Sequence, residues 1–105
     1  MNNPYYDPEK CGLEIIETLD ESGLCYEFNM LVVWKNKDGK LYFMKDSGCS
    51  CPTPFEWCYY NGENDTNLEE IIEGNYRGAI QEIEEFPAES KNLRKYIREY
   101  FESKF

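Results

Sequence analysis

The stretch from Leu24 to Lys35 alternates between two kinds of position, and this alternation constrains the fold more than any other feature of the chain. One set of alternate positions holds only large apolar side chains: Tyr26, Phe28, Met30, Val32 and Trp34. The intervening positions hold Cys25, Glu27, Asn29, Leu31 and Val33. Because successive side chains of an extended strand point to opposite faces, this alternation predicts a β-strand. We expect it to be the central strand of a sheet.

The residues that follow, Asn36-Lys37-Asp38-Gly39, predict a hairpin. They suit a type I turn followed by a left-handed glycine, which makes a three-residue loop with a bulge at Gly39. The pairs in this register are Asn36 with Lys40, Trp34 with Tyr42, and Val32 with Met44. A two-residue loop would instead place Lys37 opposite Lys40, and directly opposed like charges are unfavourable. We therefore expect a bulged hairpin that leads into a strand over Leu41–Lys45.

Helical spacing replaces strand alternation in the second half of the chain. Asp65 or Thr66 can cap a helix, and Gly74-Asn75 should interrupt it. The inward face of this first helix would be Leu68, Ile71 and Ile72. Apolar residues then recur at steps of three and four until Pro87, at Tyr76, Ala79, Ile80, Ile83 and Phe86. The last segment has the clearest helical face, formed by Leu93, Tyr96, Ile97, Tyr100 and Phe101.

These patterns together predict an α+β fold. A short β-branched strand at Leu13–Leu19 precedes the hairpin, so the sheet would be three-stranded and antiparallel over about residues 13–45. Two or three helices would follow and pack on one of its faces. A chain of 105 residues can bury one modest core, so residues 1–105 should form a single domain.

The segment Asp46–Cys58 combines glycine, cysteine, proline and aromatic residues in a way that ordinary loops rarely do. We expect Asp46 to accept hydrogen bonds from the backbone two or three residues further on, and Gly48 to adopt a positive φ. The prolines should keep the middle of the segment extended, with Phe55 and Trp57 as anchors on the domain. The residues assigned to this structural motif are Asp46, Gly48, Cys49, Cys51, Pro52, Pro54 and Phe55.

Five cysteines without any histidine restrict the chemistry open to this chain. Cys49, Cys51 and Cys58 could supply three thiolates to zinc, but the Cys-x-Cys spacing favours small buried hydrophobes instead. A thiol nucleophile would lack a histidine base. We expect no cofactor, no metal and no catalytic residue, with a zinc-stabilised module as the alternative. The odd cysteine count and the lack of a secretory signal at the N-terminus predict a reducing, cytoplasmic location.

The charge distribution points to a protein partner. A net charge of −10 disfavours direct binding of nucleic acid or an anionic membrane and favours basic partners. Residues 63–89 hold nine acids and one base, for a net charge of −8, whereas residues 91–105 hold five bases and two acids. The basic helix could therefore neutralise the acidic one within the fold. The alternative is a binding face made of Glu69, Glu70, Glu73, Glu82, Glu84 and Glu85, with Trp57, Tyr59 and Tyr60 as exposed aromatic anchors.

Several of these segments resemble a family of small uncharacterised bacteriophage proteins, common in phages of actinobacteria. The resemblance lies in Asn3-Pro4-Tyr5-Tyr6, in Pro8-Glu9-Lys10-x-Gly12-Leu13, in the strand residues Tyr26, Phe28, Val32 and Trp34, and in Asp46-Ser47-Gly48-Cys49-Ser50-Cys51-Pro52-Thr53-Pro54-Phe55-Glu56. It covers roughly residues 3–73 and implies an origin rather than an activity.

We therefore expect a small, acidic, non-enzymatic phage protein that inhibits a host or defence protein by occupying its basic surface. An inhibitor of the anti-CRISPR or anti-restriction type, acting by nucleic-acid mimicry in the host cytoplasm, would fit this description. The alternative is a structural or accessory phage module, zinc-stabilised or dimeric through its aromatic residues.

Overall fold

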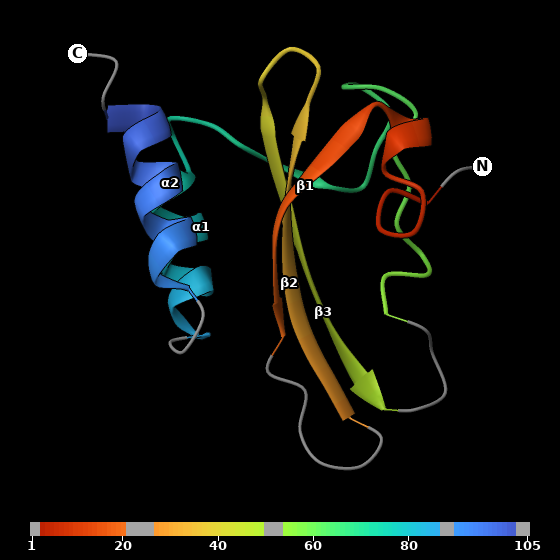
Figure 1. Ribbon diagram of the computed structural model, residues 1–105, viewed down its shortest axis with the longest axis horizontal. Coiled ribbons are helices and arrows are strands. Elements are labelled where there is room, and N and C mark those ends of the chain that lie inside the picture. The colour runs from red at the N-terminus through yellow and green to blue at the C-terminus, as the bar shows by residue number, and fades with distance from the viewer. Residues whose placement is uncertain (1–2, 21–26, 50–53, 87–89, 103–105) are drawn as a thin grey trace.

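The computed structural model describes residues 3–20, 27–49, 54–86 and 90–102. These residues form a four-stranded antiparallel sheet in the order β1-β2-β3-β4, and two helices (Figure 1). The elements are the 3-10 turn η1 (Glu9–Cys11), β1 (Leu13–Asp20), β2 (Glu27–Asn36), β3 (Leu41–Cys49), β4 (Glu69–Ile71), α1 (Tyr76–Glu84) and α2 (Lys91–Glu102). The predicted α+β class is confirmed, although the sheet has one strand more than the sequence indicated.

The β2–β3 hairpin forms in the predicted register. Its pairs include Trp34 with Tyr42 and Val32 with Met44. The Asn36 N–H donates to the Lys40 carbonyl over 2.9 Å, and Gly39 has a φ of 85°. Such a φ favours glycine because it has no Cβ to clash with the backbone.

Strand β3 is longer than predicted. It continues beyond Lys45 to Cys49, and its last residues pair with the beginning of β2. Gly48 is therefore a strand residue opposite Phe28 rather than part of a turn, which corrects the expectation of a connector that begins at Asp46.

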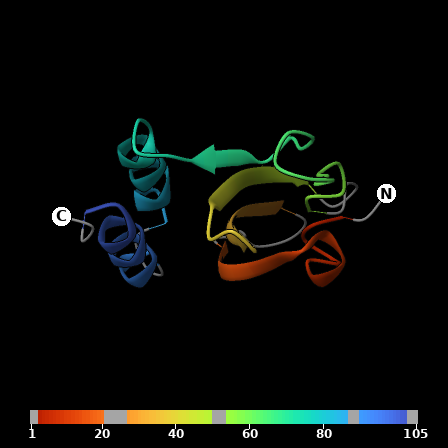
Figure 2. The same cartoon turned by 90° about the horizontal axis from the view of Figure 1, so that it is seen from above.

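Both faces of the sheet are covered, so the domain has three layers (Figures 1 and 2). On one face, α1 and α2 bury Leu31, Val33, Leu41 and Phe43 beneath apolar residues that include Ile80, Ile83, Leu93 and Ile97. On the other face, the chain around residues 3–12 and 54–68 covers Met30, Val32, Trp34, Tyr42 and Met44. This arrangement explains why alternate positions of β2 are apolar on both sides.

The predicted helix over residues 66–72 is absent, and this part of the chain forms β4 instead. Glu69–Ile71 pairs with Leu41–Phe43 of β3. Leu68 is buried on the loop-covered face of the sheet, whereas Ile71 is buried on the helical face. The spacing of three between them imitates a helical turn, but in an extended chain residues an odd number of positions apart point to opposite faces. Ile72, expected inside, is 49% exposed.

The two remaining helices agree with the sequence pattern. Asn75 directly precedes α1, but Gly74-Asn75 does not interrupt a helix as predicted, because the element before it is β4. Helix α1 buries Tyr76, Ala79, Ile80 and Ile83. Helix α2 buries Leu93 and Ile97, with Tyr96, Tyr100 and Phe101 packed against the same cluster. Within the described ranges, neither helix is long and apolar enough to cross a membrane.

Candidate binding site

The N-terminal arm, residues 3–12, is joined by hydrogen bonds to residues 54–55, which are far from it in the sequence. The Asp46 carboxylate accepts a hydrogen bond from the Phe55 N–H over 2.9 Å. The Asn3 side-chain amide donates to the Phe55 carbonyl over 2.7 Å, and the Tyr6 hydroxyl donates to the Pro54 carbonyl over 2.6 Å. The partner of Asp46 thus lies nine residues further on rather than two or three, because β3 carries Asp46 past the expected turn.

Phe55 is the anchor of this assembly. Its side chain is 0% exposed, and its ring lies 4.9 Å from the ring of Tyr5 and 6.3 Å from that of Trp34. The Trp34 indole in turn donates a hydrogen bond to the Pro4 carbonyl. Trp57, the second predicted anchor, is 53% exposed, so this part of the prediction is wrong. Residues 50–53, which include Cys51 and Pro52, lie outside the described residues.

Cys58, one of the three zinc candidates, is buried on the loop-covered face of the sheet. Its Sγ lies 2.8 Å from Sδ of Met44. Burial, followed by the negative charge of Asp46, raises the pKa of the Cys58 thiol from 9.0 to about 12. A buried neutral thiol of this kind packs as a small hydrophobe. No group of three potential metal ligands occurs among the residues that can be described, a set that leaves out Cys51 and the side chain of Cys49.

We expect stability to fall at alkaline pH because of Cys58. Well below pH 9.0 the thiol is protonated in both the folded and unfolded chain, and it contributes no pH dependence. As pH rises towards the folded pKa of about 12, only the unfolded chain ionises, so the free energy of unfolding decreases. The slope from this group approaches about 1.4 kcal/mol per pH unit.

The measurement is urea unfolding at about pH 8 and about pH 10.5 under reducing conditions. The Cys58→Ala variant should be less stable at the lower pH but should lose less stability between the two. Equal losses in both proteins would contradict the assignment.

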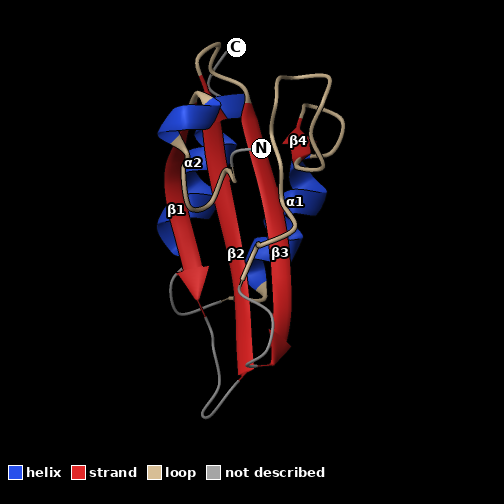
Figure 3. Ribbon diagram, turned by 90° about the vertical axis from the view of Figure 1, so that its right-hand side faces the viewer, coloured by secondary structure: helices blue, strands red, loops and turns tan. Residues whose placement is uncertain are grey.

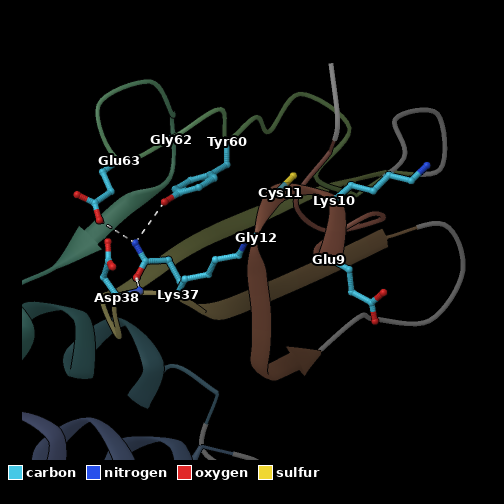
Figure 4. A pocket seen from close by; sticks show the side chains of 10 residues that line it. Glu9, Lys10, Cys11, Gly12, Lys37, Asp38, Tyr60, Gly62 and Glu63 are labelled. Atoms are coloured by element: carbon cyan, nitrogen blue, oxygen red, sulfur yellow. Dashed lines mark hydrogen bonds between the residues drawn. The ribbon is translucent and has the colours of Figure 1, made fainter.

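A polar pocket of about 420 Å³ lies between η1, the β2–β3 turn and the loop around Gly62 (Figure 4). The buried Asn36 side chain organises it. Its oxygen accepts hydrogen bonds from the N–H groups of Asp38 and Lys40, and its amide nitrogen donates to the Tyr60 hydroxyl and to Glu63. Since these bonds satisfy Asn36 internally, we interpret the pocket as the support of the hairpin rather than as a binding site.

One acid that lines this pocket, Glu63, has a basic partner. Lys40 forms an ion pair with Glu63 at 2.8 Å. The hydrogen bond from Lys40 lowers the pKa of Glu63, whereas hydrogen bonding to Glu63 raises the pKa of Asp38.

A second concavity, of about 410 Å³, lies between β3, the start of β4 and helix α1. It is lined by Phe43, Glu69, Asn75, Gly78, Ala79, Gln81, Glu82 and Glu85. We call it the acidic groove, because three of the six glutamates singled out in the sequence converge there. Glu85 forms an ion pair with Lys45 at 2.6 Å, whereas Glu69 and Glu82 have no ion-pair partner in the described part of the chain.

The other predicted acids lie elsewhere. Glu84 faces α2, where its carboxylate lies 3.5 Å from Arg94 and 3.8 Å from Arg98. Among the described residues, neutralisation by the basic helix therefore applies to Glu84 and does not extend to the groove. Glu70 is half-buried in β4, opposite Tyr42. Glu73 is exposed between β4 and α1.

The predicted aromatic anchors divide in the same way. Trp57 is exposed, Tyr59 is half-buried, and Tyr60 is only 6% exposed. Tyr60 packs edge-on against Tyr42 at 5.3 Å between ring centroids. The expectation that Tyr60 is an exposed anchor is therefore wrong, because Tyr60 packs on the loop-covered face of the sheet. Sequence reasoning could not separate these adjacent aromatics without knowing which side of the chain faces the sheet.

The fold and the groove define the class of protein: a small acidic α+β domain with a three-layered core. Residues 2–102 match the family described as a domain of unknown function, DUF7574, and the chain belongs to that family. The match includes α2, beyond the roughly 3–73 covered by the sequence resemblance. No curated protein and no solved structure matches the chain.

Proposed function

We propose that this protein is a non-enzymatic binding protein that recognises a basic surface of a partner protein through the acidic groove. The observation that carries the proposal is the convergence of Glu69, Glu82 and Glu85 on one concave surface, where Lys45 is the one ion-pair partner among the residues that the structure describes. Carboxylates grouped in a concavity concentrate a negative potential, which attracts cationic groups and speeds their association.

The finer assignment is a phage-encoded inhibitor of a host or defence protein that acts in the host cytoplasm. It is supported by the resemblance of the Asp46–Glu56 motif to phage proteins and by the net charge of −10. An acidic surface of this kind can occupy the site at which an enzyme of the CRISPR or restriction type holds nucleic acid.

Charge reversal in the groove tests the proposal. We expect the Glu69→Lys, Glu82→Lys double variant to lose at least about tenfold in partner affinity, because each substitution removes an attraction and adds a repulsion. Its thermal stability should change little, since neither side chain forms an ion pair in the described residues. The assay is affinity capture of proteins from a bacterial lysate at low and moderate salt.

The matched control is Glu14→Lys, Glu17→Lys, which makes the same change in net charge at exposed positions of β1. It should keep its captured partner, and that partner should dissociate as salt rises. Equal loss of binding in both double variants would mean that only net charge matters and would reject the groove. A chain that captures no partner at either salt but forms a stable homodimer would favour an accessory module.

A further inference from the structure

Among the described residues, the outer edge of β3 is only partly paired. Strand β4 pairs with Leu41–Phe43 and does not extend beyond Phe43, whereas β3 continues to Cys49 (Figure 3). In Figure 3, β4 lies beside one end of β3, and no other labelled strand lies along the rest of that edge. An unpaired edge presents backbone groups that can receive another strand.

The hairpin geometry shows which groups these are. Asn36 and Lys40 form a hydrogen-bonded pair, and the register continues without a shift through the whole β2–β3 ladder. Hydrogen-bonded and non-hydrogen-bonded pairs alternate along such a ladder, so the odd-numbered residues of β3 direct their N–H and C=O groups away from β2. The backbone groups of Phe43, for example, point towards β4, where Phe43 pairs with Glu69. Lys45 and Ser47 have no backbone partner on this side among the residues that are described.

The acidic groove adjoins this edge. Phe43 and Glu69, the last pair between β3 and β4, both line it. Lys45 lies two residues beyond Phe43 on β3, and its side chain forms an ion pair with Glu85 of the groove. A strand that continued the line of β4 would therefore direct alternate side chains towards the helical face, where Glu82 and Glu85 lie.

The occupant that fits is a basic segment of another protein and not a second copy of this chain. Two copies joined at this edge would bring two acidic grooves together, and each chain carries a net charge of −10. The opposite edge, β1, is protected against pairing, because it has a register shift between Ile15 and Glu17 and exposes Glu14, Glu17 and Asp20.

We propose that the outer edge of β3 from Met44 to Cys49 receives an extended lysine- or arginine-rich segment of the partner as an added strand. Backbone hydrogen bonds to Lys45 and Ser47 hold the segment, and the acidic groove selects its basic side chains. This inference rests on the proposed function and specifies the conformation of the segment that is bound.

Ser47→Pro is the variant that tests it. Proline removes an N–H that bonds neither β2 nor any described residue, and proline is tolerated at such edge positions. The probe is a synthetic peptide of alternating lysine and threonine, with binding measured by calorimetry. We expect Ser47→Pro to weaken binding at least about tenfold. The control Ser47→Thr keeps the N–H and should bind like the unmodified chain.

Amide hydrogen exchange of the unmodified chain gives a second readout, which is independent of how well Ser47→Pro folds. The peptide should slow exchange at Lys45 and Ser47. Exchange that stays unchanged there, or slows along β1 instead, would overturn the inference. The inference would also be overturned if Ser47→Pro bound the peptide as well as the unmodified chain does, while the Glu69→Lys, Glu82→Lys double variant did not bind it. In that case the proposed function would still stand. A peptide that binds none of these proteins would reject both.

Discussion

Replacing Phe55 by alanine is expected to destabilise the domain by about 3–5 kcal/mol, which is the usual cost of truncating a buried phenylalanine. Its ring is fully buried between Tyr5 and Trp34, and its backbone bonds to Asp46 and Asn3. The cavity would therefore loosen both the N-terminal arm and the Asp46–Cys58 segment. Since small domains are stable by roughly 5–15 kcal/mol, the loss should be plain in urea unfolding.

Two further substitutions make this prediction specific. Trp57→Ala, two residues away at an exposed position, should change stability by no more than about 0.5 kcal/mol. Phe55 also has a φ of 61°, a left-handed conformation that costs a residue with a Cβ about 1 kcal/mol. Phe55→Gly should consequently be no less stable than Phe55→Ala, although glycine in an ordinary strand or helix is the less stable of the two. A similar loss for Trp57→Ala and Phe55→Ala would show that Phe55 is not the anchor.

The second large effect is expected at Ile97, whose replacement by alanine should cost about 2–5 kcal/mol. Ile97 is 0% exposed and lies in the core between the helices and the sheet. Its loss should weaken the docking of α2 on α1 and on the helical face of the sheet. Chemical denaturation monitored by circular dichroism measures the change in unfolding free energy.

Lys95→Ala is the matched control on the same helix. The Lys95 side chain is 72% exposed, and its ion pair with Glu99 spans 4.0 Å, so the substitution should cost less than about 0.5 kcal/mol. If Ile97→Ala proved equally mild, α2 would not be packed against the core as described.

The Asp46–Cys58 segment shows where prediction from the sequence stopped. Phe55 and Trp57 were both predicted as anchors, and the sequence could not show that only Phe55 of the two is buried. The partner of Asp46 could not be recognised, because it depends on how far β3 runs before the chain turns back. The same uncertainty affected Tyr60, which is buried only because the loop after Cys58 folds onto the sheet beside Tyr42.

The sequence by itself determined the β2–β3 hairpin, its register and the buried faces of α1 and α2. These features depend on residues that are close along the chain: the alternation in β2, the Asn36–Gly39 turn and the three-and-four spacing around Ile83 and Ile97. Tertiary structure alone decided that Glu69–Ile71 is a strand, that Glu84 faces α2 while Glu82 faces the groove, and that no described strand pairs with the outer edge of β3 beyond Phe43. Each of these depends on which distant segment lies alongside, and local spacing carries no information about that.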